Sequence, residues 1–228
     1  MKGFLFVPAI LCAVSGAASA VVVQFDFNTA ASVTQAGWTG APLGNGSGGG
    51  VTIATTAIGA VTVDSRDRVA ANTDGAGADI GNNDMWRDFV FALNSFSAAP
   101  GTGLSLALLG LSPNTTYPIT IWAFDDLSNA QADGFARAAD WSGGGGGGTL
   151  AFPSTPDPTS LTDYSVTFNA LTDGAGALTI RGTVAATNPS ASHNVFINGL
   201  RIGDAIPEPS TGLLGVVALG AMVLRRRR

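Results

Sequence analysis

The sequence predicts an all-β protein, an antiparallel and jelly-roll-like β-sandwich that is flanked by an N-terminal signal helix and a C-terminal hydrophobic helix. Short runs of alternating or continuous apolar residues are separated by Gly, Pro, Asn and Asp, which is typical of strands joined by turns. The acidic residues are Asp with the single exception of Glu208, and Lys2 is the only lysine, a composition that favours turns over long helices. Eight or more such runs, with no repeating period, favour a sandwich over a solenoid.

The expected strands follow one another along the chain with short gaps. The last long pair, 164–171 and 177–184, alternates cleanly and is joined by Asp173-Gly-Ala-Gly176, which predicts a hairpin. The glycine-rich stretches 44–50 and 143–148 are expected to be surface loops, because glycine loses much entropy when it is ordered. The predicted strands are 21–27, 51–63, 87–93, 104–110, 117–124, 164–171, 177–184 and 194–202.

Charge and cysteine content exclude several classes of function. Between residues 21 and 224, six arginines stand against 16 acidic residues, a formal net charge of −10. Such a body is repelled by phosphates, so no nucleic acid partner is expected. The only cysteine, Cys12, lies in the N-terminal apolar segment, which leaves the body without disulfides, cysteine nucleophiles or cysteine-based metal sites.

The N-terminus reads as a secretory signal. Lys2 precedes an apolar core from Phe4 to about Val14, and Ala18-Ser19-Ala20 fits a small-x-small cleavage site. We expect signal peptidase to cut after Ala20. The chain then divides into a signal peptide (1–20), a β-sandwich domain (21–204) and a C-terminal segment (205–228).

The C-terminal segment has three ordered parts: Pro207-Glu208-Pro209, an apolar run over 211–224, and an arginine cluster. As a helix the run is about 21 Å long, shorter than a bilayer core of about 30 Å. The segment resembles the PEP-CTERM sorting signal, with Arg225, Arg226, Arg227 and Arg228 as its basic end. The resemblance implies processing by an exosortase in a Gram-negative bacterium that makes extracellular polysaccharide. The protein would lie transiently in the inner membrane and then at the cell surface or in the extracellular matrix.

The body also carries a resemblance, in the stretches 66–92, 108–126, 135–142 and 195–202. These are similar to exported PEP-CTERM proteins of planctomycete and verrucomicrobial type, whose bodies resemble carbohydrate-binding sandwich modules. Residues 110–117 (GLSPNTTY) are typical of a sandwich corner, in which Leu111 packs, Pro113 and Asn114 turn, and Tyr117 tethers the loop. The resemblance implies a sandwich fold and a polysaccharide as ligand.

Glycan binding would use an aromatic face beside polar side chains. Trp141, next to Asp140 and Arg137, is the first candidate, and Trp38 is a second, because both tryptophans flank loops. The alternative is that Trp141 closes the end of the sandwich. Trp86 and Trp122 fall in strand patterns and are expected in the core.

A structural calcium ion is the only cofactor that the sequence suggests. The stretch from Asn72 to Asp84 is rich in the hard oxygen ligands that calcium prefers, with Asp74, Asp79 and Asp84 as candidates. The alternative is a loop rich in Asx-turns.

We predict a non-enzymatic protein. His193 is the only histidine, and no nucleophile elbow accompanies it. The acidic pairs Asp125-Asp126 and Asp84 with Asp88 leave a polysaccharide hydrolase as a rival, although adjacent Asp residues at strand ends are usually solvated. An ice-binding or adhesive protein ranks lower, because 51–63 lacks a regular threonine ladder.

Overall fold

A computed structural model describes residues 22–67, 83–93, 101–125, 136–152, 156–188 and 194–206. The expected signal helix and the sorting segment from Pro207 onward lie outside these residues, as does His193. Within the described ranges, no helix combines the length and apolarity that crossing a membrane requires.

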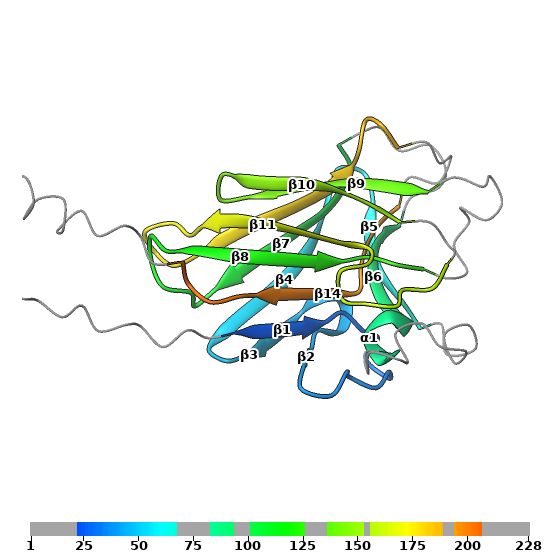
Figure 1. The fold of residues 1–228 in the computed structure, drawn as a ribbon, viewed down its shortest axis with the longest axis horizontal. Coiled ribbons are helices and arrows are strands. Elements are labelled where there is room, and N and C mark those ends of the chain that lie inside the picture. The colour runs from blue at the N-terminus through cyan, green and yellow to red at the C-terminus, as the bar shows by residue number, and fades with distance from the viewer. Residues whose placement is uncertain are drawn as a thin grey trace, which may run out of the picture.

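The described chain is almost entirely strand, which confirms the all-β class (Figure 1). Two larger sheets pack face to face, and a smaller sheet lies at one end. The strand pairs are antiparallel except β1 with β2. The front sheet runs β11 (Ser165–Leu171), β8 (Thr116–Trp122), β14 (Gly199–Ile202), β1 (Val23–Asp26), β2 (Thr39–Gly40). The back sheet runs β10 (Gly146–Phe152), β9 (Arg137–Gly143), β12 (Leu178–Val184), β7 (Gly103–Leu109), β4 (Val51–Ile58), β3 (Gly46–Gly48). The end sheet runs β13 (Val195–Ile197), β6 (Asp88–Leu93), β5 (Thr62–Asp67).

The core lies between the front and back sheets. Alternate residues of each strand point inward, so Ile119 and Ile121 of β8 face the same core as Leu104 and Leu106 of β7. Burying each of these side chains stabilises the fold by roughly 1.5–3 kcal/mol. The period-2 alternation read from the sequence therefore decides which face of each strand is buried.

A second, smaller cluster of buried residues surrounds the short helix α1 (Asn83–Arg87). Met85 and Trp86 of α1 are fully buried against Trp122 and Phe124. The rings of Trp86 and Phe124 meet edge to face, with their centroids 6.3 Å apart. The prediction that Trp86 and Trp122 are buried is confirmed. The strand expected at Trp86 is wrong, because this residue lies on α1.

Two long runs that the sequence analysis treated as single strands are each divided. Residues 51–63 break at Gly59, whose φ of 83° turns the chain from the back sheet into the end sheet. Residues 194–202 break at Asn198, so that β13 joins the end sheet and β14 joins the front sheet. Apolar periodicity continues across both breaks and gave no sign of them.

The predicted hairpin between 164–171 and 177–184 is wrong. Strand β11 belongs to the front sheet and β12 to the back sheet, so their connection is a corner between sheets. Asp173 orders this corner by accepting hydrogen bonds from the backbone N–H groups of Ala175 and Ala177 at 2.8 and 2.9 Å. The alternation read from both runs is confirmed, because Phe168 and Ile180 both point into the core.

The two glycine-rich stretches are not simply loops, which corrects the sequence analysis. Gly46–Gly48 form β3, and Gly146 to Gly148 open β10. A side chain at Gly146 would collide with the carbonyl oxygen of Asn169 on β11. Glycine thus lets an edge strand of the back sheet approach the edge of the front sheet.

The predicted corner over 110–117 is confirmed. The backbone N–H of Ser112 donates to the hydroxyl oxygen of Tyr117 at 3.1 Å. Leu111 is buried, and Asn114 takes a positive φ of 49°. The side chain of Tyr117 therefore ties the loop back to the strand that follows it.

The two ends of the described chain leave the sandwich at the same end (Figure 1). Val23 opens β1 opposite Ile202 of β14, and Ile206 bridges to Thr116 at the start of β8. Helix α1 lies toward the other end of the molecule.

Candidate functional site

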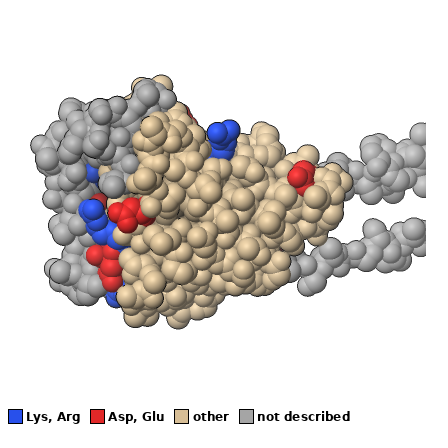
Figure 2. Space-filling model, turned by 180° about the vertical axis from the view of Figure 1, so that it is seen from behind, with Lys and Arg blue, Asp and Glu red and all other residues tan. Residues whose placement is uncertain are grey.

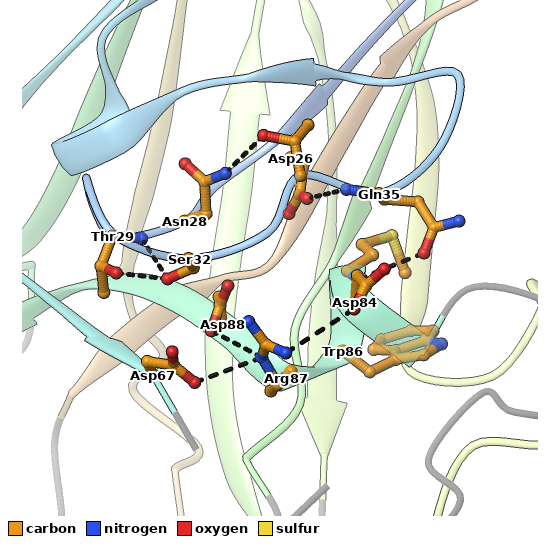
Figure 3. Close-up of polar contacts among 12 residues, drawn as sticks. Asp26, Asn28, Thr29, Ser32, Gln35, Asp67, Asp84, Trp86, Arg87 and Asp88 are labelled. Atoms are coloured by element: carbon orange, nitrogen blue, oxygen red, sulfur yellow. Dashed lines mark hydrogen bonds and ion pairs between the residues drawn. The ribbon is translucent and has the colours of Figure 1, made fainter. Parts of the chain in front are cut away.

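Three carboxylates surround one guanidinium beside α1 (Figure 3). The Nε of Arg87 lies 3.2 Å from a carboxylate oxygen of Asp67 on β5 and 3.5 Å from one of Asp88 on β6. Its Nη1 lies 3.7 Å from Asp84, one turn earlier on α1. Because one arginine meets three acids, the carboxylate cluster around Arg87 carries an excess of negative charge.

The loop that follows β1 ties this cluster to the front sheet. A carboxylate oxygen of Asp26 accepts a hydrogen bond from the backbone N–H of Gln35 at 2.6 Å. The side-chain oxygen of Gln35 lies 3.4 Å from the backbone nitrogen of Met85, which donates to it. Asn28 steadies the same loop by donating to the hydroxyl of Thr34 at 2.9 Å. The polar contacts therefore link β1, the loop and α1 in one network (Figure 3).

Burial sets the acidity of two members of this network. Both Asp26 and Asp88 are fully buried. Desolvation raises the pKa of Asp26 to about 6, against the lowering effect of the Gln35 N–H. Desolvation, reinforced by the charge of Asp67, raises the pKa of Asp88 to about 7. Each side chain thus holds a proton to a higher pH than an exposed aspartate does.

The pKa values of Asp26 and Asp88 are raised, but neither carboxyl faces solvent. Asp88, which the sequence analysis considered with Asp84 as an acid pair, has no exposed surface with which to meet a substrate. Within the described ranges, no group of three or more His, Cys, Asp or Glu side chains is arranged to hold a metal ion. Of the calcium candidates, Asp84 pairs with Arg87, while Asp74 and Asp79 lie outside the described residues. Calcium binding stays a prediction.

The candidate glycan residues on β9 do not come together. Trp141 points inward and is 1% exposed, and its ring lies directly against Gly182 of β12. Asp140 points to the opposite face, where it accepts a hydrogen bond from the Thr149 hydroxyl at 2.6 Å. Period-2 alternation makes this separation unavoidable for adjacent residues. Trp141 therefore packs in the core between the two larger sheets and offers no exposed ring for stacking.

Arg137 is also buried, which the sequence analysis did not expect of a glycan-binding side chain. Its guanidinium lies 4.7 Å from the centre of the Phe196 ring and 3.9 Å from a carboxylate oxygen of Asp125. Asp125 is 2% exposed, so the expectation of a solvated turn residue is wrong. The two residues form a buried ion pair between the end of β8 and the start of β9.

Trp38 is half-buried rather than freely exposed. Its ring meets Trp122 edge to face at 5.6 Å, and it lies over Gly199 of β14. Trp38 thus covers the end of the front sheet that lies nearest to α1.

Sequence reasoning missed a hollow on the outer face of the front sheet. It has a volume of about 350 Å³, and it is open to solvent. Strand alternation was the available signal, because the outward positions of 117–124 and 194–202 include Thr120 and Arg201. The hollow is lined by Pro118, Thr120, Arg201, Gly203 and Asp204.

No protein-family model matches this chain, and no curated protein matches it. Among solved structures, the chain is similar to the ANXUR1 extracellular domain of Arabidopsis thaliana, at 13% identity and a TM-score of 0.44, over 80% of this chain and 48% of that one. The ANXUR2 extracellular domain of the same plant gives 11% identity and a TM-score of 0.41, over 80% and 49%. This chain thus spans about half the length of either ectodomain.

Proposed function

We propose that this protein is an exported, jelly-roll-like sandwich that is sorted by an exosortase and binds glycan without catalysis at the cell surface or in the exopolysaccharide matrix. The observation that carries the binding part is the open hollow on the front sheet, lined by Thr120, Arg201 and Asp204. Hydroxyl, guanidinium and carboxylate groups together supply both the donors and the acceptors that sugar hydroxyls need.

The positions of the chain ends support the sorting part of the proposal. Ile206 bridges to Thr116 at the end of the sandwich away from α1, and Pro207-Glu208-Pro209 follows it directly in the sequence. A sorting segment that starts there can be held at a membrane or by an exosortase while both outer sheet faces stay accessible. Cleavage near the Pro-Glu-Pro sequence would then release the sandwich without disturbing its core.

Intact-mass measurement of the protein isolated from its own cells tests sorting. We expect a mature species that starts at Val21 and lacks Arg225 to Arg228. A mature protein that keeps these arginines in quantity would contradict exosortase processing. A Glu208→Ala variant, compared with an Asp204→Ala variant that leaves the sorting sequence intact, would separate recognition of the motif from general effects on export.

Binding of the full chain, in mild detergent, to immobilised polysaccharides tests the glycan part. The panel contains neutral glucans and galactomannan together with acidic alginate, each with added calcium and then with a chelator. Retention on at least one polysaccharide is expected. Loss of retention with chelator would support the proposed structural calcium, and the absence of retention on every polysaccharide would contradict glycan binding.

A further inference from the structure

Four polar side chains form one row across the outer face of the front sheet. Residue pairing places Thr167 of β11 opposite Thr120 of β8, Thr120 opposite Arg201 of β14, and Arg201 opposite Gln24 of β1. Residues directly opposite one another in a sheet lie on the same face. The four strands are spaced at about 4.8 Å, so the row runs perpendicular to the strands over roughly 14 Å.

The row faces solvent, in contrast to its neighbours on the same strands. Thr167 and Arg201 are exposed, and Thr120 and Gln24 are half-buried. The residues on either side of Thr120, Ile119 and Ile121, point into the core. The hydroxyls of Thr120 and Thr167 lie 2.9 Å apart and share a hydrogen bond, which fixes the side chains of both in place.

The hollow begins at this row and extends to one side of it. Thr120 and Arg201 belong to both, and the hollow adds Pro118, Gly203 and Asp204. The ring of Pro118 gives an apolar patch beside the polar row. Gly203 lines the hollow without filling it, and any side chain at this position would press on the Pro118 ring. An elongated ligand with alternating apolar and hydroxyl faces fits such a surface.

The local charge favours a neutral ligand. Arg201 and Asp204 line the same hollow, and their charges offset each other there. The molecule as a whole has a formal net charge of −5, which opposes the approach of polyanions. Figure 2 shows the opposite side of the molecule, which is turned away in Figure 1. Charged groups gather there at the end that holds the Arg87 cluster, and most of the remaining surface on that side is uncharged.

We propose that a neutral polysaccharide chain binds across the front sheet, along the row Thr167, Thr120, Arg201 and Gln24, with a sugar unit held in the adjoining hollow. This proposal rests on the proposed glycan binding and gives it a location and a ligand class. The guanidinium of Arg201 donates to sugar oxygens at the centre of the row, and Asp204 accepts from sugar hydroxyls in the hollow. The two threonine hydroxyls contact the same chain on the β11 side.

The back sheet offers a matched control. Arg181 of β12 is also exposed on an outer face, opposite Ser105 of β7 and Ser142 of β9. It therefore has a similar position in a similar polar row. An Arg181→Ala variant loses the same chemical group as Arg201→Ala, from the opposite side of the same protein.

The test compares full-length wild type with Arg201→Ala, Arg201→Lys, Thr120→Val and Arg181→Ala, using soluble neutral glucan and galactomannan against alginate. Thermal unfolding first establishes that each variant is folded.

We expect Arg201→Ala to weaken the binding of the neutral polymer by about tenfold or more and Thr120→Val by several-fold, because each removes hydrogen bonds made at the centre of the row. Arg201→Lys should recover only part of the affinity, because lysine lacks the planar fork of donors. Arg181→Ala should bind as wild type does.

Each other outcome has a definite meaning. Wild-type binding that Arg201→Ala and Thr120→Val leave unchanged would overturn this location and leave glycan binding as a function of another surface. Equal losses in Arg201→Ala and Arg181→Ala would reduce the effect to general charge and overturn the location as well. Tighter binding of alginate than of both neutral polymers would overturn the neutral class. Wild type that binds none of the polymers would overturn the proposed glycan binding together with this inference.

Discussion

The side-chain amide of Asn198 donates a hydrogen bond to the carbonyl oxygen of Asp88, 2.8 Å away. The same amide nitrogen lies 3.2 Å from the carbonyl oxygen of Trp86, and the amide oxygen accepts from the backbone N–H of Phe124 at 2.7 Å. Asn198 is fully buried at the break between β13 and β14. One side chain thus joins the end sheet, α1 and the end of β8.

Asn198→Ala should destabilise the protein by about 3 kcal/mol, because it leaves buried backbone groups without hydrogen-bond partners. Chemical denaturation followed by circular dichroism measures this change. Asn169→Ala, on the exposed face of β11, is the control and should change the free energy of unfolding by less than about 0.5 kcal/mol. Equal effects of the two substitutions would contradict the role given to Asn198.

The acidity of Asp26 and Asp88 predicts that stability falls as the pH rises from about 4 to about 7. Their folded-state pKa values, about 6 and about 7, lie above the ordinary value of 3.8. Between these limits the unfolded chain has released protons that the folded chain still holds, so raising the pH favours unfolding. Urea denaturation at pH 4.5, 6 and 8 should show a decrease on the order of 1–3 kcal/mol.

Asp88→Asn should reduce this pH dependence, because asparagine resembles the protonated carboxyl and does not titrate. The variant should be more stable than wild type at pH 8. Asn169→Ala changes an exposed side chain on β11 that does not titrate and should keep the wild-type slope. A slope that is the same in all three proteins would show that Asp88 does not govern it.

Trp141→Ala should cost about 3–5 kcal/mol of stability, because a large buried side chain is lost from the core. Trp141→Phe should cost less, since it keeps most of the apolar volume against Gly182. Calorimetric unfolding measures both. A stable Trp141→Ala protein that had lost only glycan binding would instead support the surface role that the sequence suggested.

Gly146→Ala should destabilise the sandwich by more than 1 kcal/mol, because the added methyl group collides with the Asn169 carbonyl oxygen. Gly174→Ala is a suitable comparison: a methyl group there meets only the edge of Asn114, at 4.0 Å. Thermal unfolding should therefore show a clear decrease in Tm for the first variant and little change for the second. Similar small changes would contradict the close packing of β10 on β11 at Gly146.

Asp125→Ala should destabilise the protein by about 3–5 kcal/mol, because it removes the carboxylate that lies 3.9 Å from the buried guanidinium of Arg137. Adding Arg137→Met should restore a substantial part of this loss, since methionine can occupy the space over Phe196 without a charge. The free energies of unfolding of the single and double variants form a double-mutant cycle. Strictly additive effects would argue against coupling between the two residues.

Local sequence patterns were sufficient to predict the strands in which apolar and polar residues alternate over many positions. The alternation over 177–184 predicts that Leu178 and Ile180 share one face, and the structure buries both. Period-2 side-chain geometry does not depend on which strand lies alongside. The corner at Tyr117 was equally predictable, since its tether spans only five residues of chain. The candidate glycan residues were harder to predict. Adjacency in the sequence suggested that Trp141 and Asp140 act together, but adjacent residues of a strand face opposite ways.

By itself, the sequence determined the all-β class, the buried face of the strands that alternate cleanly and the acidic character of the body. These depend on composition and on contacts between near neighbours. The sorting roles of the two terminal segments stay predictions. Tertiary structure alone decided that Gly59 and Asn198 divide strands between sheets, that Asp88 and Arg137 are buried, and that Thr167, Thr120, Arg201 and Gln24 share one row. These features depend on pairing between segments far apart in the chain, and residue order carries no local signal of which strands will become neighbours.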